Sequence, residues 1–148
     1  MVHLELAIDI QASNNDVWRG ITNWTAQGDW MMATTVTSLD GAGEHVGARL
    51  EAFTGIGKLG FLDTMTIASW DPPNRCDVDH TGKVVKGTGT FVVTPLSAHT
   101  SRFIWSEDLD IPLGIIGKIG FLLVKPFFLF GIRRSLAKFA HLVEIGKI

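Results

Sequence analysis

The chain of 148 residues has the length of one domain, with 46% hydrophobic and 19% charged residues and a net charge of −2. This composition excludes a disordered chain, and the single cysteine, Cys76, excludes a disulfide framework and a cysteine-rich zinc site. We therefore expect one domain over residues 1–148, in a reducing cytoplasmic location, because the first residues lack the layout of a signal peptide.

The first thirty residues predict one strand and two short helices. Residues 4–10 alternate between apolar and polar side chains, which is the pattern of a half-buried strand. Ser13 is a good N-cap, and Asp16 places a carboxylate in the first turn of a helix expected over residues 14–20. Residues 23–29 predict a second short helix or turn.

Short β-prone runs alternate with turn residues over the next part of the chain. Two prolines, Pro72 and Pro73, end one of these runs because proline cannot donate to a strand ladder. Consecutive strands joined by short turns indicate an antiparallel meander. The predicted strands cover residues 34–39, 47–53, 59–70, 75–81, 83–95 and 100–110.

The C-terminal segment differs from the body in charge and hydropathy. Residues 1–110 carry seven basic and fourteen acidic side chains (−7), whereas residues 111–148 carry six basic side chains and only Glu144 (+5). From residue 128 onward the apolar positions share one face of an amphipathic helix, and Pro126 should kink it. We expect this helix to pack on the acidic body. Nucleic acid is disfavoured as a partner because the basic residues do not cluster with stacking aromatics.

Residues 111–132 are long enough to cross a bilayer, with only Lys118 and Lys125 charged. Each lysine near the middle of a span would cost about 2.5–3.5 kcal/mol. We therefore expect this segment to be buried within the fold or against a partner. The alternatives for residues 111–132, in order of preference, are peripheral contact with a membrane and insertion across it.

Several short motifs lie along the chain in a characteristic order: residues 12–18, Trp24, residues 28–30, 47–50, 70–75 and 103–105, and the final helix. This order resembles the START-like (SRPBCC, birch-pollen-allergen-like) superfamily, and within it the polyketide cyclase/dehydrase and lipid-transport group. The resemblance covers essentially the whole chain. It implies an α+β helix-grip fold, in which a curved antiparallel sheet of six to seven strands wraps around the long C-terminal helix. An apolar cavity would lie between sheet and helix, and the glycines recurring every three residues from 114 to 120 would then suit a flexible lid.

The alternation of side chains along each strand predicts which of them face the helix. Phe53 is placed inward on this basis, together with Arg49 and Glu51. The alternative for each aromatic residue is that it fills a solid core. With the cavity that the resemblance implies, the expected ligand-binding residues are Trp30, Phe53, Met65, His80, Phe91, Phe103, Trp105, Phe128, Ile132 and Phe139.

Polar side chains on the same faces are candidates for acid–base chemistry. Burial moves the pKa of an acid or an imidazole, which can fit it for proton transfer. Asp63 and His80 are the candidate catalytic residues, although a solvated strand start and a strand-end histidine are the alternatives. Arg49 and Glu51 are two residues apart and equally fit a surface pair.

The expected function is the binding or transport of a hydrophobic small molecule, such as a lipid, an isoprenoid or a polyketide-like compound. The five histidines show no metal-ligand spacing, and we expect neither a metal nor a cofactor. An enzyme of the polyketide cyclase/dehydrase type is one alternative. A module that docks on a membrane or a partner through residues 111–127 is the other.

Overall fold

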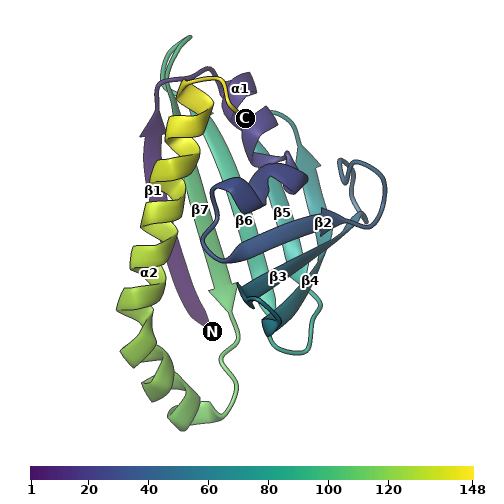
Figure 1. Ribbon diagram of the computed structural model, residues 1–148, viewed down its shortest axis with the longest axis vertical. Coiled ribbons are helices and arrows are strands. Elements are labelled where there is room, and N and C mark those ends of the chain that lie inside the picture. The colour runs from purple at the N-terminus through teal and green to yellow at the C-terminus, as the bar shows by residue number, and fades with distance from the viewer.

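Seven strands form one antiparallel sheet in the order β1-β7-β6-β5-β4-β3-β2, and the computed structural model describes residues 1–148. The sheet curves strongly, so that β2 and β3 cross in front of β5 and β6 (Figure 1). The curved antiparallel sheet with a long C-terminal helix confirms the predicted fold class. The strands are β1 (Val2–Ile10), β2 (Thr34–Ser38), β3 (Arg49–Ile56), β4 (Leu59–Asp71), β5 (Arg75–His80), β6 (Gly87–Pro95) and β7 (Ser101–Leu109).

Two short helices follow β1, as the sequence predicts. α1 (Asn14–Ile21) begins at Ser13, whose Oγ accepts a hydrogen bond from the backbone N–H of Asp16 at 3.2 Å. Val17 and Ile21 lie on its buried face. The second element, η1 (Trp24–Asp29), is a 3₁₀-helix. Together they connect β1 to the far edge strand, β2.

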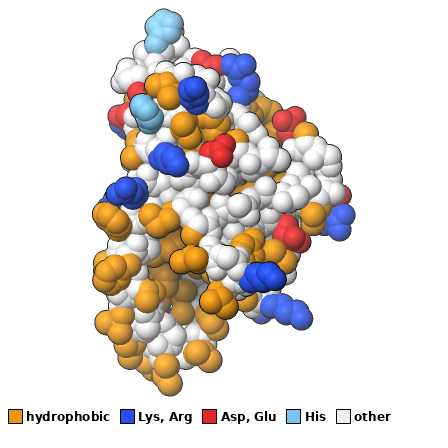
Figure 2. Space-filling view, viewed as in Figure 1, with side chains coloured by type: hydrophobic (Ala, Val, Ile, Leu, Met, Phe, Trp, Pro, Cys, Tyr) orange, Lys and Arg blue, Asp and Glu red, His pale blue; other side chains and the backbone are white.

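The C-terminal helix α2 (Gly114–Glu144) is continuous, with Pro126 inside it, but its two halves have different surroundings. Its C-terminal half buries Ile132, Leu136, Phe139 and Val143, and the helix packs against β1 and α1. Its N-terminal half stands away from the sheet (Figure 1), and hydrophobic side chains cover that half in Figure 2. The expected burial of residues 111–127 within the fold is therefore wrong, since Ile115, Ile119 and Leu123 are all exposed.

The interior is densely packed near the C-terminal half of α2. The ring of Phe139 lies 4.9 Å from that of Trp30 and 5.7 Å from that of Phe103, centroid to centroid. Phe103 and Phe139 are both fully buried. These three aromatic side chains pack together between the sheet and the helix.

The inner face of β3 is the opposite of the predicted one. Leu50 and Ala52 are buried and face the helix, so Phe53 lies on the outer face with Arg49 and Glu51. The ring of Phe53 covers Gly60 on the neighbouring strand, where an added Cβ would lie 2.8 Å from the ring. The small and aliphatic side chains of β3 thus face inward, and the aromatic one packs over a glycine outside.

Candidate functional site

A cavity of 410 Å³ lies between the inner face of the sheet and the middle of α2. This volume falls within the range of roughly 300–1,000 Å³ that is usual for small-molecule sites. Its walls are mainly apolar and aromatic. The sheet contributes Leu50, Ala52, Met65, Val78, Phe91 and Trp105, and α2 contributes Phe127, Phe128 and Ile132.

Six of the expected ligand-binding residues line this cavity: Met65, His80, Phe91, Trp105, Phe128 and Ile132. Their part in binding stays a prediction. The other four do not line it: Trp30, Phe103 and Phe139 fill the packed core beside it, and Phe53 lies outside the sheet. The sequence analysis missed Leu50 and Ala52 because it assigned the inner face of β3 to the aromatic side chain.

Three titratable side chains interrupt the apolar wall at one place. His80 donates from Nδ1 to both carboxylate oxygens of Asp63, at 2.9 and 3.1 Å, and from Nε2 to Glu107 Oε2 at 2.8 Å. The exposed fractions of the Asp63, His80 and Glu107 side chains are 12%, 5% and 13%. All three line the cavity, and we call them the Asp–His–Glu cluster.

Asp63, His80 and Glu107 lie on three different strands of the sheet. Two of these strands, β5 and β7, do not pair with each other. Asp63 lies on β4 two residues before Met65, and Met65 is the register partner of His80 on β5. Glu107 lies on β7, separated from β5 by β6. The residue of β6 opposite Glu107 is Gly89, and a Cβ there would lie 3.0 Å from both Glu107 carboxylate oxygens. The missing side chain leaves the space that the Glu107 carboxylate uses to reach His80.

The surroundings shift the pKa of two members of the cluster. Burial alone lowers the pKa of the His80 imidazole, but the hydrogen bonds to Asp63 and Glu107 and their negative charges raise it to about 10. His80 is therefore an imidazolium at neutral pH, which agrees with both ring nitrogens donating. Burial raises the pKa of the Glu107 carboxyl, although the contact with His80 opposes that shift.

The sequence pattern identified Asp63 and His80 but gave no signal for Glu107. In the chain Glu107 stands beside Asp108 near the end of a strand, and nothing there separates it from a solvated acid. Its place in the cluster depends on the strand order and on Gly89. The one feature that indicates this role of Glu107 is Gly89, a glycine on the inner face of the neighbouring strand β6.

The remaining polar candidates do not belong to this site. Arg49 lies on the surface with its Nε 2.9 Å from Asp40 Oδ2, and the guanidinium lowers the pKa of that carboxyl to about 2. Glu51 shares the outer face of β3 with Arg49. Burial raises the pKa of the Cys76 thiol to about 12, so it is protonated at neutral pH and a poor nucleophile. No group of His, Cys, Asp and Glu has an arrangement that could hold a metal ion.

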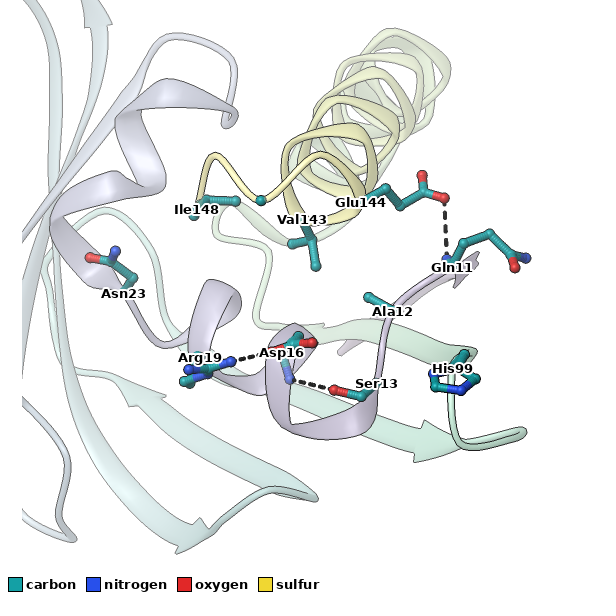
Figure 3. A pocket seen from close by; sticks show the side chains of 11 residues that line it. Gln11, Ala12, Ser13, Asp16, Arg19, Asn23, His99, Val143, Glu144 and Ile148 are labelled. Carbon is teal, nitrogen blue, oxygen red and sulfur yellow. Dashed lines mark hydrogen bonds and ion pairs between the residues drawn. The ribbon is translucent and has the colours of Figure 1, made fainter.

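A second hollow, of 610 Å³, lies at the opposite end of the molecule between α1 and the C-terminal end of α2 (Figure 3). Its polar groups largely bond to one another: Glu144 accepts from the backbone N–H of Gln11, and Arg19 pairs with Asp16. Arg19 and Asp16 are also 76% and 48% exposed. These contacts tie α2 to β1 and α1, and the wall lacks the apolar surface of the first cavity.

Comparison with known proteins gives both a family match and structural neighbours. The family model described as polyketide cyclase/dehydrase and lipid transport matches residues 1–144. No curated protein sequence matches the chain.

Solved structures of low sequence identity share the fold. TTHA0849 from Thermus thermophilus has a TM-score of 0.81 at 14% identity, over 99% of this chain and 100% of that one. The Zhui aromatase/cyclase from Streptomyces sp. R1128 has a TM-score of 0.77 at 15% identity, over 97% and 93%. The di-domain aromatase/cyclase BexL of the BE-7585A biosynthetic pathway has a TM-score of 0.74 at 19% identity, over 97% of this chain. This chain covers 47% of BexL, about half its length.

Proposed function

Since the chain belongs to the polyketide cyclase/dehydrase and lipid-transport family, we propose that it binds a hydrophobic small molecule of lipid, isoprenoid or polyketide type in the cavity between the sheet and α2. The observation that carries this proposal is the composition of the cavity wall, which is mainly apolar. Its charged side chains are those of the Asp–His–Glu cluster, and its other polar side chains are Gln27, Thr34, Thr54 and Ser135. Transfer of the apolar part of a ligand from water into such a wall supplies most of the affinity.

The Asp–His–Glu cluster defines how the ligand lies. Both ring nitrogens of His80 are already engaged by carboxylates, while Glu107 Oε1 takes part in none of the side-chain hydrogen bonds. A ligand hydroxyl or another donor would bond to Glu107 Oε1, and the apolar part would lie against Phe91, Trp105 and Phe128. The preferred ligand is therefore a largely hydrocarbon or aromatic compound with a polar group at one end.

Native mass spectrometry of the full chain, purified from its own host without detergent, tests this proposal. We expect a co-purifying small molecule, which is released on unfolding and competes with the fluorescent apolar probe 1-anilinonaphthalene-8-sulfonate. Absence of a bound mass, together with no saturable binding of the probe, would overturn the proposal.

A second candidate function, acid–base catalysis of the cyclase/dehydratase type, is favoured by the Asp–His–Glu cluster itself. In a dehydration, the Glu107 carboxylate would take the proton next to the carbonyl of a β-hydroxycarbonyl substrate. A carbon–carbon double bond would form as the carbon–oxygen bond breaks, and the proton taken up by Glu107 would pass to the leaving hydroxide to give water. This step returns Glu107 to its carboxylate form, while His80 would hold Glu107 Oε2 through their 2.8 Å hydrogen bond.

The two functions differ in what Glu107→Gln does. A binding protein keeps its affinity for the co-purified compound within a few-fold, and the compound keeps its mass. An enzyme converts that compound, or a β-hydroxycarbonyl relative of it, to a product lighter by one water, and Glu107→Gln abolishes the conversion. Conversion that survives in Glu107→Gln excludes the catalytic role of the cluster.

A further inference from the structure

One face of the N-terminal half of α2 is apolar and uncovered. It consists of Ile115, Ile116, Ile119, Leu123, Phe127 and Phe130, whose exposed fractions run from 56% to 78%. At about 100° per residue, these six side chains fall within roughly 120° of the helix circumference. We call this the apolar outer face. Five of the six point away from the side that carries Phe128 and Ile132 and faces the cavity, and Phe127 lies at the edge between the two sides.

The same side of α2 becomes cationic one turn further along. Arg133, Arg134 and Lys138 follow Phe130 there; all three are exposed and none forms an ion pair. The chain has no acidic residue between Asp110 and Glu144. Figure 2 shows this sequence of surfaces, with hydrophobic side chains over the lower part of α2 and Lys and Arg side chains above them. An apolar face thus continues directly into an unpaired basic one.

We propose that α2 docks on an anionic lipid bilayer, with the apolar outer face in the boundary between headgroups and acyl chains and Arg133, Arg134 and Lys138 on the headgroups. A helix with an apolar face and a basic continuation has the two features that bind it to an anionic membrane surface. A second copy that packed through the same face would offer it no negative charge, because the face carries no acid. The bilayer supplies both the apolar layer and the negative charge.

The chain geometry places the helix on the membrane rather than across it. α2 is long and apolar enough to span a bilayer by length and composition. However, four residues, 110–113, join its start to the end of β7, and Ile132 at the end of its exposed half is buried in the core. Both ends of the exposed half are therefore held by the same domain, so the helix lies in the plane of the surface.

This docking surface goes beyond the proposed ligand binding and does not depend on it. Phe127 belongs to the apolar outer face and also lines the cavity, so the cavity opens beside the docked surface. A ligand could enter there from the bilayer, but the docking itself needs only the exterior of α2.

Vesicle flotation of the full chain tests the docking. We expect the protein to float with vesicles of phosphatidylcholine and phosphatidylglycerol, and at least ten-fold less with vesicles of phosphatidylcholine alone. The double variant Ile119→Gln/Leu123→Gln keeps good helix formers in place and should lose at least ten-fold in binding. Arg134→Glu should lose several-fold, and the loss should grow at low salt.

Matched changes at the other end of the molecule serve as controls. Leu96→Gln removes an exposed apolar side chain from the β6–β7 turn, and Lys147→Glu reverses an exposed charge beyond the end of α2. Both should bind vesicles as the unaltered chain does. Circular dichroism and saturable probe binding in the cavity check that each variant is folded, which separates loss of docking from loss of the ligand site.

Three results would overturn the proposal. The first is equal binding to both kinds of vesicle, and the second is binding that Ile119→Gln/Leu123→Gln leaves unchanged. The third is a stable dimer in sedimentation that the same double variant dissociates, without any vesicle binding, because the face would then belong to a second copy.

Discussion

His80 and Glu107 share a hydrogen bond of 2.8 Å, although their strands, β5 and β7, do not pair with each other. The strand between them, β6, presents Gly89 at this point, and Glu107 uses the space that a larger side chain would fill. A buried imidazolium is in this way held between two carboxylates in a mostly apolar cavity wall. The chemistry of the cavity therefore depends on a glycine that takes no part in it.

The first prediction concerns the pH dependence of stability. Because the pKa of His80 is about 10 in the folded chain and about 6.5 when unfolded, its stabilising effect is fully present near pH 6.5 and is lost as the pH rises through 10. The free energy of unfolding should fall by up to about 1.4 kcal/mol per pH unit over this window. Urea titrations from pH 6.5 to 10.5, followed by tryptophan fluorescence, measure the slope.

The variants for this experiment are His80→Gln and His99→Gln. The stability difference between the unaltered chain and His80→Gln should be largest near pH 6.5 and should shrink toward pH 10. His99 lies in the exposed turn between β6 and β7, so its replacement should leave the slope unchanged. A difference that is independent of pH would mean that His80 is neutral in the folded chain.

The second prediction concerns the role of Gly89. Gly89→Ala places a methyl group 3.0 Å from both Glu107 carboxylate oxygens, so the carboxylate has to shift, which disturbs its hydrogen bond to His80. NMR titration of the histidine side chains should then show a lower pKa for His80, shifted in the same direction as in Glu107→Gln. Asp63→Asn should also lower it, since both carboxylates raise it in the unaltered chain. An unchanged pKa in all three variants would contradict the cluster.

The third prediction concerns the size of the cavity. Ala52 is buried and lines the cavity, so Ala52→Phe fills part of it with a ring. We expect the affinity for 1-anilinonaphthalene-8-sulfonate to fall at least ten-fold while the far-ultraviolet circular dichroism is retained. Thr37→Phe adds the same ring to an exposed position of β2 and should change the affinity less than two-fold. Equal effects of the two substitutions would place probe binding outside the cavity.

The fourth prediction compares two phenylalanines of α2. Phe139 is fully buried, and Phe139→Ala should lower the free energy of unfolding by about 3–5 kcal/mol. Phe130 is 63% exposed, and Phe130→Ala should change it by no more than about 0.5 kcal/mol. Chemical denaturation at neutral pH measures both. A large cost at Phe130 would show that the N-terminal half of α2 is buried in solution.

Local sequence signals predicted the elements because each depends on neighbouring residues. Ser13 caps α1 as expected, and the prolines at 72 and 73 lie directly after β4. The start of β6 was less accurate: residues 83–86 were assigned to the strand, which begins at Gly87. An apolar pair such as Val84 and Val85 favours a strand locally but does not show whether a neighbouring strand is there to pair with it.

The two faces of β3 differ in charge: Leu50 and Ala52 lie on one, and Arg49, Glu51 and Phe53 lie on the other. The prediction gave the aromatic ring more weight than the two charged side chains beside it, and it was wrong. On the outer face the Phe53 ring covers Gly60 of β4. That contact joins two strands, so the sequence of β3 alone does not show it.

Patterns a few residues long are enough to predict the order of strands and helices, the family resemblance, and Asp63 and His80 as inward-facing candidates. The folded chain was needed to show that Glu107 joins His80, that Phe103 and Phe139 belong to the core, and that the N-terminal half of α2 is uncovered. Those outcomes depend on contacts across three strands and on how far a helix extends beyond its sheet. Both the contacts and the extent of the helix depend on side chains that are far apart in the sequence. These side chains come together only when the sheet curves.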